Sequence, residues 1–265
     1  MSDARAIAPE RNPVKPSTIT LDDERTYPET PDVPTFQHHL ARYEFVLPMV
    51  RRSDEILETG CGAGYGSHML SARARSVVAI DYSPAALAYA RDRFNAPNLT
   101  HLLMNCHRLA FSDGSFDLIV SFELFEHLEA PEEYLSECRR VLRPGGRLVL
   151  STPNRSSWDI HMRSIGTDYE YHVNMQDLKG LQTQLGKFFQ NVEIYSQWRR
   201  GNALHRALRA LDVWNLRLRL VPAQKREKLQ QAMGVPGGGA VKSTDWVFTR
   251  SQRRQANHFV AICRK

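Results

Sequence analysis

The chain has 265 residues, of which 42% are hydrophobic and 24% are charged, and its formal net charge is +6. A chain of this length and composition buries a substantial core, which excludes an intrinsically disordered protein. It has no apolar run of the ~18 residues that a membrane-spanning helix needs, and residues 1–20 lack the apolar stretch of a signal peptide. The four cysteines show no CxxC spacing, so we expect neither a zinc site nor disulfides, and a reducing cytoplasm.

Predicted strands and helices alternate along most of the chain. After residues 1–20, an amphipathic helix is expected over Phe36–Val50. The predicted strands are Glu55–Glu58, Ser76–Ile80, Leu99–Met104, Phe116–Phe122, Arg147–Ser151, Phe188–Ser196 and His258–Cys263. The predicted helices between them are Tyr65–Arg73, Ser83–Phe94, Pro131–Leu142 and Asp177–Leu185. This alternation indicates βαβ units, and therefore an α/β fold with a mostly parallel sheet.

A glycine-rich turn joins the first predicted strand to the first helix, in the run I-L-E-T-G-C-G-A-G-Y-G that starts at Ile56. Glycines let the backbone turn sharply and approach a ligand closely. In an open α/β sheet this turn lies at the crevice where ligands bind. The spacing differs from the G-x-G-x-x-G of dinucleotide-binding proteins, which disfavours a nicotinamide-dependent dehydrogenase. Glu58 at the end of the strand would repel a pyrophosphate and suits a ligand that carries an ammonium group.

This turn resembles the first motif of the class I S-adenosylmethionine (SAM)-dependent methyltransferases, in particular the type 11 group. Three later segments resemble the family in the same order: the second strand ending at Asp81, the stretch Asn105–Asp117, and Arg139–Asn154. The resemblance covers roughly residues 21–197 and the final strand. It implies a Rossmann-like sheet of seven strands, the last antiparallel, with helices on both faces, and SAM as cofactor. The cofactor-binding residues that it implies are Glu58, Gly60, Cys61, Gly62, Gly64, Asp81, Tyr82, Asn105, Cys106 and Phe122.

Two of these positions have a stated role. Asp81 is placed to accept both hydroxyls of a ribose, as an acidic residue at the end of the second strand does in nucleotide-binding folds. Asn105 stands where the family usually has an Asp that accepts from the adenine amino group, and an amide oxygen can accept the same bond.

A cluster of ionisable residues follows the fourth predicted strand. Glu123, Glu126 and His127 share one face of a helical turn. In the family that the chain resembles, a His here is proposed as a general base with a neighbouring carboxylate, which makes His127 and Glu126 the candidate catalytic residues. The E-x-x-E-H pattern also resembles ubiquinone-biosynthesis O-methyltransferases and small-RNA 3′-end 2′-O-methyltransferases, in which it binds a divalent cation. That resemblance implies Glu123, Glu126, His127 and His172 as ligands of Mg²⁺, Mn²⁺ or Zn²⁺. Both interpretations remain open.

The predicted organisation is a disordered tail (1–20), an N-terminal lid helix region (21–53), a SAM-binding core (54–197 and 257–265) and a basic helical insert that forms an acceptor lid (198–256). The positive charge is concentrated in this insert. Residues 199–228 hold nine basic and two acidic side chains, and the rest of the chain is close to neutral. The insert is therefore interpreted either as a solvated helix face or as a contact for an acidic acceptor, a membrane surface or a partner subunit.

The function expected from these features is transfer of a methyl group from SAM to a small-molecule acceptor, with oxygen as the acceptor atom, by a cytoplasmic monomer or homodimer. One alternative is an RNA 2′-O-methyltransferase with a divalent metal site. It is disfavoured because no RNA-binding module or aromatic–basic interleaving is present. The other is a non-catalytic SAM-binding scaffold, which would have no need of Glu58, the glycines and Asp81.

Overall fold

The computed structural model of the protein describes residues 25–29, 33–159, 171–200, 225, 241–251 and 256–265. Its strands are β1 (Glu55–Thr59), β2 (Ser76–Asp81), β3 (Leu99–Leu103), β4 (Phe116–Ser121), β5 (Leu142–Pro153), β6 (Asn191–Arg199), β7 (Trp246–Thr249) and β8 (His258–Arg264). Its helices are α1 (Val33–Val46), α2 (Tyr65–Ser71), α3 (Pro84–Arg93), α4 (Pro131–Val141) and α6 (Leu178–Gly186), with short 3₁₀ turns η1 (Leu47–Met49), η2 (Phe125–His127) and η4 (Ser243–Asp245).

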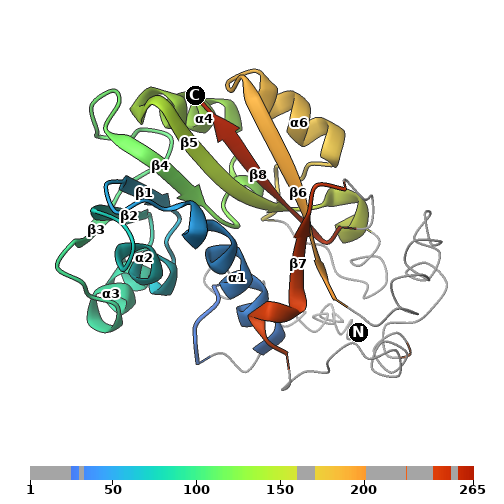
Figure 1. Ribbon diagram of the computed structural model, residues 1–265, viewed down its shortest axis with the longest axis horizontal. Helices are drawn as coiled ribbons and strands as arrows, with labels where there is room; N and C mark the ends of the chain where they lie inside the picture. The colour runs from blue at the N-terminus through green and yellow to red at the C-terminus, as the bar shows by residue number, and fades with distance from the viewer. Residues whose placement is uncertain (1–24, 30–32, 160–170, 201–224, 226–240, 252–255) are drawn as a thin grey trace, which may run out of the picture.

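These strands form one sheet of order β3-β2-β1-β4-β5-β8-β6-β7 (Figure 1). Strands β1 to β5 pair in parallel. Strand β8 runs antiparallel to β5 and to β6, and β7 runs antiparallel to β6. The predicted α/β class with its mostly parallel, Rossmann-like sheet is confirmed.

The number of strands differs from the expected seven, because the described residues include an eighth, β7. This strand lies inside the range 198–256 that was assigned to the helical insert. It is only four residues long and pairs through its backbone with Ser196–Arg199 at the edge of the sheet. Phe248 stacks on Phe45 of α1, with ring centroids 4.4 Å apart. A short edge strand whose position depends on a distant helix leaves little signal in the local sequence.

Both faces of the sheet are covered, which explains why its central strands are apolar without alternation. Successive residues of β1 enter different clusters: Leu57 packs with residues of α4 and α6, and Ile56 packs with residues of α1 and α2. All four side chains Ile56, Leu57, Leu118 and Ile119 of β1 and β4 are fully buried. The parallel strands β1 and β4 are therefore buried at the centre of the sheet, with an apolar cluster on each face.

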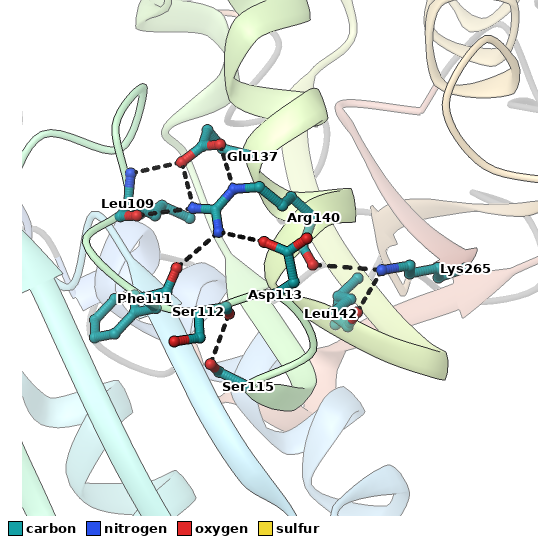
Figure 2. Close-up of polar contacts among 9 residues, drawn as sticks. All are labelled: Leu109, Phe111, Ser112, Asp113, Ser115, Glu137, Arg140, Leu142 and Lys265. Carbon is teal, nitrogen blue, oxygen red and sulfur yellow. Dashed lines mark hydrogen bonds and ion pairs between the residues drawn. The ribbon is translucent and has the colours of Figure 1, made fainter.

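The loop between β3 and β4 is held by one side chain of α4 (Figure 2). The Arg140 guanidinium donates to the carbonyl oxygens of Leu109 (2.8 Å) and Phe111 (2.7 Å), and to the carboxylates of Asp113 (2.9 Å) and Glu137 (2.7 Å). Five planar donors suit this task, because they satisfy several loop carbonyls at once. This loop begins with residues that line the site described below.

The termini of the parallel strands set the position of that site. Because parallel strands point the same way, the segments that follow β1, β2 and β4 meet at one edge of the sheet. The predicted tail and most of the predicted insert lie outside the described residues, so their boundaries remain predictions. Among the described residues, no helix has the length and apolar character to cross a membrane.

Candidate active site

Two adjoining cavities open at the carboxyl edge of the sheet. The inner cavity, about 130 Å³, lies beside the glycine-rich turn and α1. The outer cavity, about 450 Å³, lies beside the segment after β3. The residues that line both are Gly60, Asp81, Tyr82, Leu124 and His127. Strand ends that are far apart in the sequence thus contribute to one continuous site.

The glycine-rich turn has the backbone conformation that its glycines permit. Gly60, Gly62 and Gly64 have φ values of +71°, +52° and +83°, a region that residues with a Cβ rarely adopt. At Gly64 a Cβ would also lie 2.5 Å from the Cβ of Ala90 in α3. The turn is tied to β2 by hydrogen bonds from the Gly60 and Cys61 amides to the Ile80 carbonyl (2.9 and 3.0 Å). The glycines therefore allow the turn to pack closely against α3 and β2.

Asp81 ends β2 and faces both cavities. Its carboxylate accepts hydrogen bonds from the Gly62 amide (2.8 Å) and the Ser83 amide (2.9 Å). It also forms a two-pronged ion pair with Arg25, at 3.1 and 3.2 Å. These contacts orient the carboxylate at the boundary between the two cavities.

Glu58 lies behind the turn. Its carboxylate is 1% exposed, accepts from the Tyr43 hydroxyl at 2.7 Å and is also bonded by Ser67. Burial raises the pKa of Glu58 to about 7, against the lowering effect of these two hydrogen bonds. The carboxylate expected to face the ligand's ammonium group is therefore engaged by α1 and α2, and Glu58 is not among the residues that line the cavities.

Glu126, His127 and His172 come together, and their potential ligand atoms lie within 4.8 Å of one another. Glu126 is buried, and its Oε2 has no hydrogen-bond partner among the described residues. Burial, together with the nearby Glu123 carboxylate, raises the pKa of Glu126. His127 Nδ1 lies 3.1 Å from the Tyr171 carbonyl oxygen, which assigns the proton to Nδ1 and the basic lone pair to Nε2. Burial lowers the pKa of His127, so its ring is neutral near pH 7.

Glu123 lies outside that group and belongs to a different network. It is the one described non-glycine residue with a positive φ (+52°). Its carboxylate accepts from the Ser151 hydroxyl (2.7 Å) and lies 2.9 Å from His258 Nε2 and 3.4 Å from an Arg42 nitrogen. Burial would raise its pKa, but the Arg42 guanidinium holds the pKa well below its usual range. The fully buried Arg42 also donates to Gln197 at 2.8 Å, so α1 is locked to β6, to β8 and to the segment after β4.

Residues 57–150 match the model of a methyltransferase domain family. A Mycobacterium tuberculosis protein named "Probable S-adenosylmethionine-dependent methyltransferase" is 38% identical over 149 residues, which is 56% of this chain and 53% of that protein. A ubiquinone biosynthesis O-methyltransferase from Cereibacter sphaeroides is 32% identical over 124 residues, 46% of this chain and 50% of that enzyme. Residues 57–150 therefore match a methyltransferase domain, and a relative of this part of the chain is named as a probable SAM-dependent methyltransferase. The chain spans about half the length of these curated relatives.

Solved structures resemble the fold of this methyltransferase domain at low sequence identity. A SAM-dependent methyltransferase from Thermotoga maritima has a TM-score of 0.57 and 15% identity, covering 88% of this chain and 93% of that one. The [4+2]-cyclase SpnF has a TM-score of 0.54 and 18% identity, covering 91% of this chain and 86% of that one. Because the same fold carries a protein named for another reaction, these likenesses describe architecture and not activity.

Most residues predicted to bind the cofactor of the methyltransferase domain line the cavities. Those in the inner cavity are Gly60, Cys61, Gly62, Asp81, Tyr82 and Phe122, and those added by the outer cavity are Asn105 and Cys106. Gly64, within the turn, and Glu58, behind it, line neither cavity. Of the four predicted metal ligands, Glu126, His127 and His172 are together, whereas Glu123 is held by Arg42 and His258.

Three residues of the site were missed by sequence reasoning. Arg25 contacts Asp81, Arg42 contacts Glu123, and His258 contacts Glu123 from the last strand. The local signal for Arg42 was weak: it follows His38 by one helical turn, and Arg42 Nη2 lies 3.2 Å from that imidazole. Arg25 and His258 left no signal, because neither belongs to a motif and each acts through a partner far away in the chain.

Proposed function

We propose that this chain transfers the methyl group of SAM to a small-molecule acceptor, and that the acceptor atom is oxygen. The position of His127 carries the proposal, because this neutral imidazole lines both cavities and so lies between two binding spaces. The methyltransferase family of the domain supports SAM as the methyl donor. The likeness to ubiquinone biosynthesis O-methyltransferases supports oxygen as the acceptor atom.

The cofactor half of the proposal rests on the chemistry of the lining residues. The Asp81 carboxylate is a two-oxygen acceptor suited to a ribose diol. Asn105 and Cys106 line the outer cavity, where an adenine would lie beside the Asn105 amide, whose oxygen accepts from the His107 amide at 2.9 Å. SAM, the methyl donor, carries no phosphate group. It therefore suits a turn that lies beside two acidic side chains, Glu58 and Asp81, which would repel a phosphate.

Bound SAM supplies an electrophilic methyl group on a sulfonium. A hydroxyl acceptor must lose its proton as the oxygen–carbon bond forms and the sulfur–carbon bond breaks. His127 Nε2 is the basic atom that takes this proton, and the Tyr171 carbonyl holds the ring in the required tautomer. Phe122, Leu124 and Tyr43 form apolar walls that exclude water from the reacting atoms.

Radiolabelled methyl transfer tests the proposal. The protein is incubated with methyl-tritiated SAM and, in separate reactions, with caffeate, tryptamine and a short RNA oligonucleotide. We expect label to be transferred to caffeate, a phenolic oxygen acceptor whose carboxylate complements the nine basic residues of the segment 199–228. Transfer to tryptamine or to RNA, with none to caffeate, would contradict the choice of a small oxygen acceptor. Failure to bind SAM in calorimetry would contradict the enzyme assignment itself.

A divalent cation is the second candidate at this site, and the unsatisfied Glu126 oxygen favours it. Glu126, His127 and His172 provide one carboxylate and two imidazoles, a donor set that fits Mn²⁺ or Zn²⁺ and, less well, Mg²⁺. An ion held there would lower the pKa of a hydroxyl acceptor. Titration of Mn²⁺ into the wild type and into His172→Ala, followed by calorimetry, tests for the ion directly. Methyl transfer that is indifferent to EDTA would exclude a role for it in turnover.

A further inference from the structure

Residues 25–29, which we call the strap, precede α1 in the chain and contribute to the site. The Arg25 guanidinium pairs with both oxygens of Asp81, at 3.1 and 3.2 Å, and the two side chains are 11% and 2% exposed. The same guanidinium lies 5.7 Å from the centre of the Tyr82 ring. Arg25 and Thr26 both line the inner cavity. The strap therefore places a cation against the acidic side chain that ends β2.

The rest of the strap is anchored on α3. Tyr27 packs edge-on against Tyr89, with ring centroids 4.8 Å apart. The Tyr89 hydroxyl donates to a Glu29 carboxylate oxygen at 2.5 Å. The strap thus has two attachments, one at Asp81 and one at Tyr89. The second attachment does not involve Asp81.

The acceptor capacity of the Asp81 carboxylate is already used. A carboxylate offers about four lone-pair positions. Here Oδ1 accepts from the Ser83 amide and one Arg25 nitrogen, and Oδ2 accepts from the Gly62 amide and the other Arg25 nitrogen. The two amides belong to the fixed backbone, so they stay in place. A ribose diol can reach this carboxylate only at the two positions that Arg25 holds.

We propose that Arg25 is an internal competitor for the ribose subsite at Asp81, so that the strap leaves this carboxylate when SAM binds and returns when the product departs. The inference rests on the proposed function. Its consequence follows from mass action: if only a fraction of the molecules has Asp81 open, the apparent dissociation constant is the intrinsic one divided by that fraction. The strap then limits cofactor affinity and favours exchange of product for substrate.

Calorimetry of SAM binding tests the competition. Arg25→Gln removes the charge and the forked geometry, and we expect its Kd for SAM to be about 10-fold lower than that of the wild type, as for an open state populated to about 10%. Arg73→Gln is the matched control, because Arg73 is an exposed arginine in the turn after α2 and its loss changes the net charge equally. Its Kd should equal the wild-type value.

Two further variants exclude a general effect on folding. Tyr27→Ala weakens the strap without touching Asp81, and we expect a smaller gain in affinity of about 3-fold. In an Asp81→Asn background the gain from Arg25→Gln should disappear, because the pair no longer exists. Equal or weaker binding by Arg25→Gln, or an undiminished gain in the Asp81→Asn background, would overturn the proposal. If the wild type binds no SAM, the proposed function fails first, and this inference fails with it.

Discussion

The two walls of the site are built in different ways. On the side where the cofactor is proposed to bind, which we call the cofactor-side wall, backbone amides hold a carboxylate: the Gly62 and Ser83 amides contact Asp81 directly. On the opposite side, around Glu123, the contacts are between side chains from α1, β5 and β8. One wall depends on local backbone geometry, and the other depends on buried charges that meet across the fold.

This difference has an energetic meaning. Backbone donors are fixed by the fold and need no further ordering, so they lose little conformational entropy when they orient a carboxylate. Buried charges must instead be balanced, because an unpaired charge in the interior costs several kcal/mol. The Arg42 guanidinium balances the Glu123 carboxylate, and His258 Nε2 lies 2.9 Å from the same carboxylate. Tyr43 connects the two walls through its hydrogen bond to Glu58.

The largest expected effect concerns the residue between the two walls. His127→Ala should lower kcat for methyl transfer to caffeate by about 10³-fold, within the range for loss of a general base, while the Kd for SAM changes little. His68→Ala, at an exposed position of α2, is the control and should keep the wild-type rate. Labelled methyl transfer and calorimetry measure the two quantities. Full turnover by the variant would remove His127 from the mechanism.

Substitution of Arg42 is the most direct test of the wall that is built from side chains. Arg42→Met should lower the free energy of unfolding by about 4 kcal/mol, because it leaves the Glu123 carboxylate without its buried guanidinium. Lys187→Met removes a comparable ion pair, with Glu132, whose side chains are 57% and 58% exposed. That change should cost less than about 1 kcal/mol. Urea unfolding of both variants tests the contrast, and equal losses would contradict it.

The cofactor-side wall predicts a dependence of stability on pH. Glu58 has a pKa of about 7 in the folded protein and close to 4.3 when unfolded. Between these values the folded state holds a proton that the unfolded state has released, so stability falls as the pH rises from about 4.5 to about 7. The difference amounts to at most about 4 kcal/mol.

Glu58→Gln removes the titrating group and keeps an acceptor for Tyr43 and Ser67. Its free energy of unfolding should therefore change less over this pH range than that of the wild type. Urea denaturation at intervals from pH 4.5 to pH 8, in the absence of SAM, measures both slopes. Identical slopes in the two proteins would mean that Glu58 does not titrate in this range.

The smallest effect tests the link between the walls. A Cβ at Gly66 would lie 2.0 Å from the Tyr43 ring, so Gly66→Ala should cost about 2 kcal/mol as the ring is forced away from Glu58. At Gly186, the last residue of α6, a Cβ would meet no atom within 4 Å. Gly186→Ala should accordingly leave the midpoint of thermal unfolding unchanged or slightly raised. A neutral Gly66→Ala would show that Tyr43 moves freely.

The fold class and the cofactor-side wall could be predicted from the amino-acid sequence. Regular alternation of apolar strands with helices indicates a parallel sheet, and the glycine spacing and Asp81 mark its carboxyl edge. These signals are local, because a strand, its turn and the following helix are consecutive in the chain. The cluster Glu126–His127 was also visible, since a helical turn brings its residues together.

Only the tertiary structure decided which charges meet. Glu123 carries the same side chain as Glu126, yet Arg42 and His258 engage one, while the other lies beside His127 and His172. The sequence likewise predicted Asp81 as an acceptor for a ribose and gave no sign that Arg25 pairs with its carboxylate. Such pairings join residues far apart in the chain, and their partners are set by packing of whole elements, which no local pattern encodes.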